Sequence, residues 1–378
     1  MYKNIGVLVQ SDGNLRKFLT NLKIDYIERE IKMNILKKTT LCALAALTIT
    51  AGTSAYAATF SDMPSGQMGL AIENAVKNGL IGGYEDGTVK PDAPITRAQM
   101  ATIITRAFGT KDNADVSFGD VADNAWYKDA VEKAVYMGAF KGDEKGNFNP
   151  ENNITFQETY TVLARVFQYE PRKVIVKGEE KWIPAVDANA LSSFADANSV
   201  ADWAKDYAKA LVANGGYTGI DGKLQGTAQI SRGQFAMIMD ELVSLYIDKA
   251  GTYTTGFGDG AVVVRCGDVV IDGIDTTKNI IVGYGVESKT EIKNIKSTAT
   301  VVVLGGRDRT PVEVTNSEGA KVLRADETLV SVQGELCDVR IMSPCTTVSI
   351  GWTNENPSET VFLKGYNPSS VIDLGFIG

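Results

Sequence analysis

Two arginines occupy positions at which they could bind an anion. Arg97 and Arg232 are the second residues of the tetrads TRAQ and SRGQ, each of which opens a helical stretch. A helix N-terminus carries about half a positive charge, so a cation in the first turn is slightly unfavourable and suggests a use. An arginine beside free helix N–H groups can bind an anion, and its planar fork can hold a carboxylate through two hydrogen bonds. The alternative is a surface salt bridge to a carboxylate such as Asp62 or Asp196.

The outer residues of these tetrads have a structural interpretation. A Ser or Thr that accepts a hydrogen bond from the third backbone N–H of a helix, with a Gln or Glu returning the bond, forms a capping box. A third tetrad, TFQE, has the same outer pattern but carries Phe156 in place of the arginine. The predicted capping pairs are Thr96 with Gln99, Thr155 with Glu158, and Ser231 with Gln234.

The tetrads lie in a segment that occurs three times, and this internal repeat is the strongest signal in the chain. Each copy opens on a Phe-x-Asp motif and continues into an amphipathic helix, which ends at a glycine suited to a left-handed C-cap. A second glycine, a polar loop and the tetrad follow, and the tetrad starts a second helix. Repeats two and three have a tryptophan where the first helix begins, whereas repeat one has Gln67. The aspartates are Asp62, Asp120 and Asp196, the tryptophans Trp126 and Trp203, and the glycine pairs Gly79 with Gly83, Gly138 with Gly142, and Gly215 with Gly219.

Together these motifs resemble the S-layer homology domain over residues 60–248. The resemblance implies a three-pronged, pseudo-threefold arrangement in which helices surround a central bundle and grooves form between neighbouring repeats. One repeat cannot bury its apolar face alone, so all three are needed. The family binds secondary cell-wall polysaccharide, commonly bearing pyruvate ketals, and so anchors exported proteins to the wall.

The resemblance also implies roles for the motif residues. Arg97 and Arg232 would hold the pyruvyl carboxylate, and Phe156 puts one of the three grooves in doubt. The two tryptophans would offer flat faces to sugar rings, with packing in the core as the alternative. The three aspartates would accept hydrogen bonds from sugar hydroxyls or fix the groove, with N-capping of the first helix as the alternative.

After about residue 250 the helical spacing of apolar residues disappears and a strand-like pattern replaces it. Short β-branched runs recur about every ten residues, separated by Gly, Asn, Asp and Ser, which indicates an all-β sandwich, barrel or parallel β-helix. Two strands per coil would give coils of about 20–22 residues. The region is similar to the short β-helices found beside S-layer homology repeats, so a right-handed parallel β-helix is favoured and a β-sandwich is the alternative. The expected fold class is therefore multidomain α plus β.

The N-terminal part has the layout of an export signal. Lys37 and Lys38 precede a short apolar run and the small-x-small site Ala55-Tyr56-Ala57, which predicts a secretory signal peptide cleaved after Ala57. The stretch before Met33 fits no signal, and we interpret it as translated leader. The predicted divisions are leader 1–32, signal peptide 33–57, repeats 58–110, 116–170 and 194–249, a 171–193 insertion that could form a hairpin, and a β-rich domain 256–378.

Composition narrows the function classes. The absence of histidine removes Ser-His-Asp and Cys-His nucleophilic mechanisms and His-containing zinc sites. A formal net charge of −8 makes nucleic acid a poor partner. We expect a cell-wall protein, not an enzyme, with no cofactor, no metal and no transmembrane segment after signal cleavage. Its expected partner is secondary cell-wall polysaccharide or a peptidoglycan-linked glycan, with self-association in a surface layer as a further expectation. The alternative is a polysaccharide-processing enzyme whose β-domain is catalytic.

Overall fold

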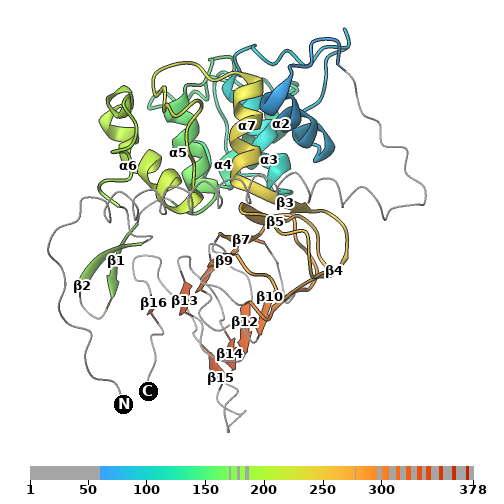
Figure 1. Ribbon diagram of the computed structural model, residues 1–378, viewed down its shortest axis with the longest axis vertical. Helices are drawn as coiled ribbons and strands as arrows, with labels where there is room; N and C mark the ends of the chain where they lie inside the picture. The colour runs from blue at the N-terminus through green and yellow to red at the C-terminus, as the bar shows by residue number, and fades with distance from the viewer. Residues whose placement is uncertain are drawn as a thin grey trace, which may run out of the picture. The chain divides into compact units, whose positions relative to one another are not determined.

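The computed structural model describes residues 60–169, 187–276, 278–295, 300–305 and 312–313 in full, together with the backbone of strands at 172–183 and 314–373 (Figure 1). All of them belong to one compact unit, Thr59–Gly378. The predicted leader, signal peptide and cleavage site lie outside the described residues. No helix within the described ranges is long and apolar enough to cross a membrane.

Each repeat contributes two helices, as the sequence predicts. The first helix of a repeat packs against the second helix of a neighbouring repeat: α4 lies on α3, α6 on α5, and α2 on α7. The repeats therefore interlock in a ring. The helices are α2 (Gly66–Lys77) and α3 (Arg97–Ala107), α4 (Lys128–Tyr136) and α5 (Phe156–Val166), and α6 (Asp202–Ala210) and α7 (Arg232–Leu242), with a 3₁₀ turn η1 (Ala197–Ser199) before α6.

A ring of three backbone hydrogen bonds closes the pseudo-threefold arrangement. The residue before each tetrad is an isoleucine, and each of these donates its N–H to the carbonyl of the next. Ile95 donates to Ile230, Ile230 to Ile154, and Ile154 to Ile95, at 3.0–3.1 Å between nitrogen and oxygen. Such a closed ring of hydrogen bonds forms only when all three repeats are present.

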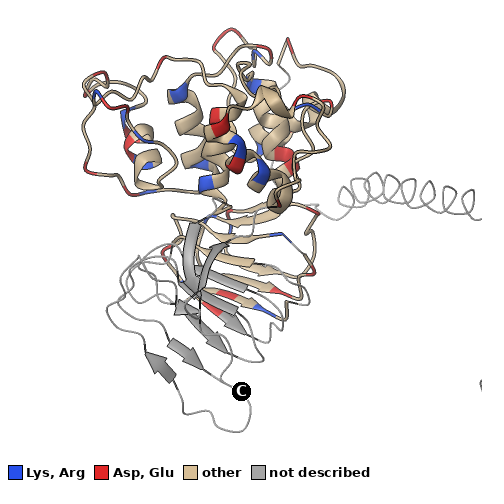
Figure 2. Cartoon of the chain, turned by 90° about the vertical axis from the view of Figure 1, so that its left-hand side faces the viewer, with Lys and Arg blue, Asp and Glu red and all other residues tan. Residues whose placement is uncertain are grey.

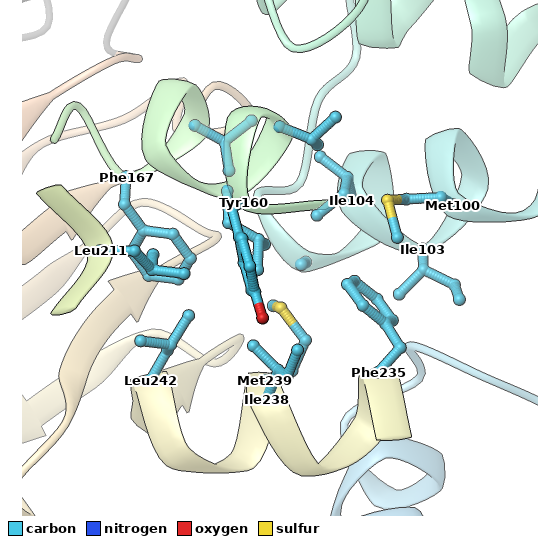
Figure 3. Packing of buried hydrophobic residues seen from close by; sticks show 14 of the residues in the cluster. Met100, Ile103, Ile104, Tyr160, Phe167, Leu211, Phe235, Ile238, Met239 and Leu242 are labelled. Atoms are coloured by element: carbon cyan, nitrogen blue, oxygen red, sulfur yellow. The ribbon is translucent and has the colours of Figure 1, made fainter. Parts of the chain in front are cut away.

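The second helices form the central bundle. Met100 and Ile104 from α3, Tyr160 from α5, and Phe235 and Met239 from α7 point into one core, where each is at most 2% exposed (Figure 3). The Tyr160 hydroxyl donates a hydrogen bond to the Leu224 carbonyl, so this buried phenol has its partner.

Two of the three predicted glycine C-caps are confirmed, and the third is wrong by one residue. Gly79 and Gly138 are both left-handed, with φ of 69°. In repeat three α6 is continued by a π-helical turn, η2 (Leu211–Gly215), which inserts an extra residue. The left-handed position consequently moves from Gly215 to Gly216, where φ is 75°.

The second glycine of each pair lies directly against the phenylalanine of the Phe-x-Asp motif in the same repeat. A Cβ on Gly142 would stand 2.5 Å from the ring of Phe118, and a Cβ on Gly83 would also collide with the ring of Phe60. The two motifs therefore form one contact, in which the motif phenylalanine packs on bare backbone.

We expect Gly142→Ala to lower the free energy of unfolding by about 1 kcal/mol, because the Phe118 ring must shift to make room for the methyl group. Urea unfolding would measure this. Gly146→Ala is not a matched control because Gly146 has positive φ, whereas Gly119→Ala meets only an asparagine side-chain oxygen at 3.5 Å. Equal loss in Gly119→Ala and Gly142→Ala would contradict the packing explanation.

The C-terminal region is a parallel β-solenoid. Alternate strands form two sheets whose neighbours pair in parallel, 17 to 22 positions apart, as Lys321 with Asp338 and Thr290 with Val312. Parallel pairing at a distance of one coil confirms the β-helix expectation and rules out the β-sandwich alternative for these strands. One sheet has the order β15-β14-β12-β10-β8-β6-β4 and the other β16-β13-β11-β9-β7-β5-β3, with antiparallel pairs only at β14–β15 and β13–β16.

The strands of the solenoid are short. One sheet contains β4 (Gly251–Tyr253), β6 (Val269–Asp272), β8 (Thr290–Lys293), β10 (Val312–Thr315), β12 (Val330–Gln333), β14 (Ser349–Gly351) and β15 (Thr360–Phe362). The other contains β3 (Val243–Ile247), β5 (Ala261–Val264), β7 (Ile280–Val282), β9 (Thr300–Val303), β11 (Lys321–Arg324), β13 (Asp338–Ile341) and β16 (Ile372–Asp373).

Two predicted divisions change in detail. The solenoid begins at Val243 and not at 256, because α7 runs straight into β3 without a linker. The predicted third repeat, 194–249, thus includes the first solenoid strand.

In the insertion, β1 (Arg172–Val176) pairs antiparallel with β2 (Glu179–Ile183), which is the hairpin that the sequence suggests.

Candidate functional site: the grooves between repeats

The two tetrad arginines reach across from one repeat to the next. Arg97 donates from Nε to the Phe148 carbonyl at 2.9 Å and from Nη2 to the Lys141 carbonyl at 3.4 Å. Arg232 donates from Nε to the Val89 carbonyl at 2.9 Å and from Nη2 to Gly82 at 2.8 Å. The salt-bridge alternative is therefore wrong, since backbone carbonyls are the partners of both guanidinium groups.

The helix amides beside these arginines are not free, contrary to the sequence-based expectation. The N–H of Arg97 donates to Asn152 and that of Ala98 to Pro150, both in the neighbouring repeat. The third N–H, of Gln99, is capped by the Thr96 hydroxyl. The same pattern holds at α5 and α7, where the first two amides bind carbonyls of the adjoining repeat. An anion in the groove must therefore be held by side chains.

All three tetrads form complete capping boxes. The Thr or Ser hydroxyl accepts from the third backbone N–H, and the Gln or Glu side chain accepts from the N-cap N–H. The pairs are the predicted ones, Thr96 with Gln99, Thr155 with Glu158, and Ser231 with Gln234.

Arg97 faces a hollow of about 220 Å³ between repeats. Phe140 and Lys141 of repeat two and Trp203 of repeat three contribute to the same hollow, which is also lined by Ala139, Glu158, Thr161, Val162 and Arg165. The guanidinium carbon stacks 5.2 Å from the ring centre of Phe140. Burial lowers the pKa of Arg97, and Glu158, Asp120 and Asp143 oppose that shift. An arginine stays charged at neutral pH, so the hollow has a fixed cation in its wall.

The tryptophans are on the surface. Trp126 is 66% exposed and Trp203 is 55% exposed. The core-packing alternative is therefore wrong for both side chains. Trp203 lies at the edge of the Arg97 hollow, and a large aromatic ring exposed in this way is unusual unless a partner covers it.

Each of the three aspartates accepts hydrogen bonds from two successive backbone N–H groups in the polar loop before the tetrad of its own repeat, a contact that we call the aspartate clamp. Asp120 accepts from the N–H groups of Phe148 and Asn149 at 2.8 and 2.6 Å. Asp62 accepts likewise from Val89 and Lys90. The N-capping alternative is wrong, because the N-caps of the first helices are Ser65, Tyr127 and Ala201.

These clamps support the arginines. The Phe148 and Val89 carbonyls that receive Arg97 and Arg232 belong to the residues whose N–H groups the aspartates hold. Each aspartate therefore fixes the loop on which the neighbouring arginine docks, and a contact with a sugar hydroxyl stays a prediction.

Comparison with protein families shows which domain these three repeats represent. The model of the S-layer homology domain matches residues 59–101, 117–159 and 193–236, one match for each repeat. The chain contains three S-layer homology domains. Each match includes one Phe-x-Asp motif and the first residues of one second helix.

Relatives of the chain include surface-layer proteins. The chain is 31% identical over 252 residues to the "Surface-layer 125 kDa protein" of Lysinibacillus sphaericus, covering 63% of this chain and 20% of the relative. It is 28% identical over 298 residues to "S-layer protein EA1" of Bacillus anthracis, covering 73% of this chain and 31% of that protein. "Exoglucanase XynX" of Acetivibrio thermocellus is 29% identical over 163 residues, 43% of this chain and 14% of the enzyme. The chain thus spans less than a third of the length of each relative.

The S-layer homology domains and these relatives indicate an exported protein of the cell surface. That location agrees with the signal peptide expected from the sequence.

Sequence reasoning missed a second arginine in each of two S-layer homology grooves. Arg165 lines the hollow that holds Arg97, and its Nη1 donates to the Ala139 carbonyl. Arg106 occupies the same place on α3 and donates to Leu80, in the repeat that receives Arg232. Both lie in the last turn of a second helix, where a cation is favourable for an ordinary reason, so their position alone gave no functional signal.

The third groove differs at each of these positions. Phe156 replaces the tetrad arginine and is fully buried. Glu241 stands where the other grooves have Arg106 and Arg165, and it accepts hydrogen bonds from the N–H and hydroxyl of Thr218. Gln67 stands where the others have tryptophan. One groove in the ring is therefore without the cations and the aromatic ring of the other two.

Proposed function

We propose that this protein anchors itself non-covalently to the bacterial cell wall by binding an anionic wall polysaccharide in two of its three inter-repeat grooves. The observation that carries the proposal is the guanidinium of Arg97, held in the wall of a hollow beside the exposed ring of Trp203. The S-layer names of the relatives support a surface-layer or surface-display role.

The geometry of the arginines defines how an acidic sugar would bind. Nε and one hydrogen of Nη2 are used by backbone carbonyls, which fix the plane of the guanidinium. Among the described residues, neither Arg97 nor Arg232 has a hydrogen-bond partner for Nη1, and neither atom is a fully buried orphan. The end-on pair of Nη1 and Nη2 is the edge available to a carboxylate, and a pyruvyl group supplies one.

The tryptophans supply the apolar half of the site. Trp203 lines the Arg97 hollow. Trp126 stands at the corresponding place of the sequence repeat in repeat two. The apolar face of a sugar ring would stack on the indole while its acidic substituent meets the arginine. The proposal gives the third groove no part, because Glu241 would repel an anion there.

Catalysis is the alternative. Two relatives are named as enzymes, "Exoglucanase XynX" and "Amylopullulanase", each matching less than half of this chain. We infer an anchoring chain with no catalytic role, since two of the surface-layer relatives match 63% and 73% of this chain, well beyond the stretch that the two enzymes match. Release of reducing sugar from wall polysaccharide by the purified protein would contradict this.

The test of anchoring is co-sedimentation with purified cell-wall sacculi that retain their polysaccharide. Trp203→Ala should weaken binding about fivefold to tenfold, since aromatic contacts of this kind are worth about 1 kcal/mol. Trp126→Ala should act similarly. Gln67→Ala, at the matching place in the third groove, should bind like the wild type. Equal pelleting by Trp126→Ala plus Trp203→Ala and by wild type would sink the proposal.

The acidic nature of the ligand is tested separately. Binding should weaken as salt rises, since partly exposed charges are screened. Sacculi stripped of pyruvate should pellet less protein, and unchanged pelleting would show that another acidic group or none is bound.

A further inference from the structure

Two solenoid strands, β5 and β7, are apolar along their whole length, and β9 is apolar after its first residue, Thr300. Every residue of β5 and β7 is buried, and so are the three valines of β9. In contrast, β6 and β8 in the other sheet alternate between buried and half-buried residues. Successive residues of a strand point to opposite faces, so β5, β7 and β9 must be covered on both sides. None of the three contains a charged residue (Figure 2).

The two faces belong to two different cores. Ile280 and Val282 lie in the interior of the solenoid together with Val262, Val264, Val301 and Val303. Ile281 between them belongs to the core of the S-layer homology repeats, together with Ala261, Val263 and Val302. One face of the sheet of β5, β7 and β9 therefore packs against the helical bundle.

Polar side chains of the solenoid also donate hydrogen bonds to carbonyls at the C-terminal ends of three helices. Arg265 donates from Nη1 to the Asn78 carbonyl at 2.9 Å, at the end of α2. Buried Asn279 donates to the Phe167 carbonyl after α5, and the Tyr284 hydroxyl donates to Met137 after α4. The last carbonyls of a helix have no partner within it, and here solenoid side chains supply one.

From these contacts we propose that the S-layer homology repeats and the first coils of the solenoid, through Leu304, are one cooperative folding unit, so that the wall-anchoring module extends beyond its third repeat. The solenoid is then joined to the repeats by a shared core and not by a hinge. A load applied to the solenoid reaches the repeats directly. This inference does not depend on which glycan binds.

Native-state hydrogen exchange tests the proposal on the full chain with Ile280→Val. This substitution removes one methylene inside the solenoid, where Ile280 belongs to the solenoid core and not to that of the repeats. We expect the slowest amides of β7 and those of α3 and α5 to exchange faster by the same factor, about 2-fold to 10-fold.

The reciprocal variant is Ile104→Val, in the bundle core on α3 (Figure 3). It should speed exchange in β5 and β7 by the factor seen in α3. If either substitution accelerates exchange only in its own half, the two halves open independently and the proposal is overturned. A conservative Ile→Val change is chosen because it leaves the protein folded. The control is Glu291→Gln on β8, which breaks only a partly exposed ion pair with Lys289 and should change exchange in both halves much less than either Ile→Val variant.

Discussion

Replacing Arg232 with alanine is expected to lower the free energy of unfolding by about 3 kcal/mol, irrespective of any effect on binding. Arg232 is only 7% exposed, and its guanidinium holds the carbonyls of Val89 and Gly82 in a different repeat. Without it, two carbonyls at the interface between repeats lose their donors, and the ring of Tyr84 loses the guanidinium 5.0 Å from its centre. Urea unfolding of the full chain would measure the loss.

Two further variants separate the causes. Arg232→Lys keeps the charge but has a single nitrogen in place of the rigid Nε and Nη2 pair that reaches the two carbonyls, so it should recover only a small part of the lost stability. Arg106→Ala removes an exposed arginine with a single long contact, 3.4 Å to the Leu80 carbonyl, and should cost less than 1 kcal/mol. An Arg232→Ala protein as stable as Arg106→Ala would show that the carbonyls do not need the fork.

This first prediction affects how wall binding is tested. An arginine-to-alanine change weakens the interface between repeats as well as removing the proposed ligand cation, so lost pelleting alone would be ambiguous. The tryptophans are exposed, so their replacement should change stability little, and a loss of pelleting in these variants can be assigned to the grooves.

The second prediction concerns the aspartate clamp of repeat three. Asp196→Asn is expected to cost about 2 kcal/mol, because an amide can offer only one acceptor where the carboxylate receives the N–H groups of Leu224 and Gln225. Asp202→Asn, which breaks an exposed ion pair with Lys205, should change stability by less than 0.5 kcal/mol or so and is the control.

The same clamp should respond to acid. Burial alone would raise the pKa of Asp196, but the hydrogen bonds from Leu224 and Gln225 outweigh it and lower the pKa below the usual 3.8. A carboxyl with a lowered native pKa stabilises the fold above its unfolded pKa and loses that contribution as pH falls through the native value. The stability difference between wild type and Asp196→Asn should therefore be constant near neutral pH and shrink below about pH 4. A difference independent of pH down to 2 would contradict the charged clamp.

The sequence by itself determined the local structure and the family. Helices, capping boxes and the repeat number follow from short-range patterns, since capping and periodicity depend on residues a few positions apart. The β-rich C-terminal region was also predicted, but only parallel pairing between distant strands separated a β-helix from a sandwich or a barrel. The Phe-x-Asp and glycine motifs identified the S-layer homology repeats without showing why these residues are needed.

Tertiary structure alone decided what those motif residues contact. Arg97 meets Phe148 and Arg232 meets Val89 only because the ring of repeats closes, and the same closure consumes the helix amides that the sequence left free for an anion. The extra π-helical residue that moves the left-handed position to Gly216 occurs in repeat three alone among the three repeats that the structure describes. Strands β5 and β7 are buried on both faces, and the helices that cover one of those faces come from much earlier in the chain. Local sequence patterns cannot specify such contacts, because their partners are brought together only by the complete fold.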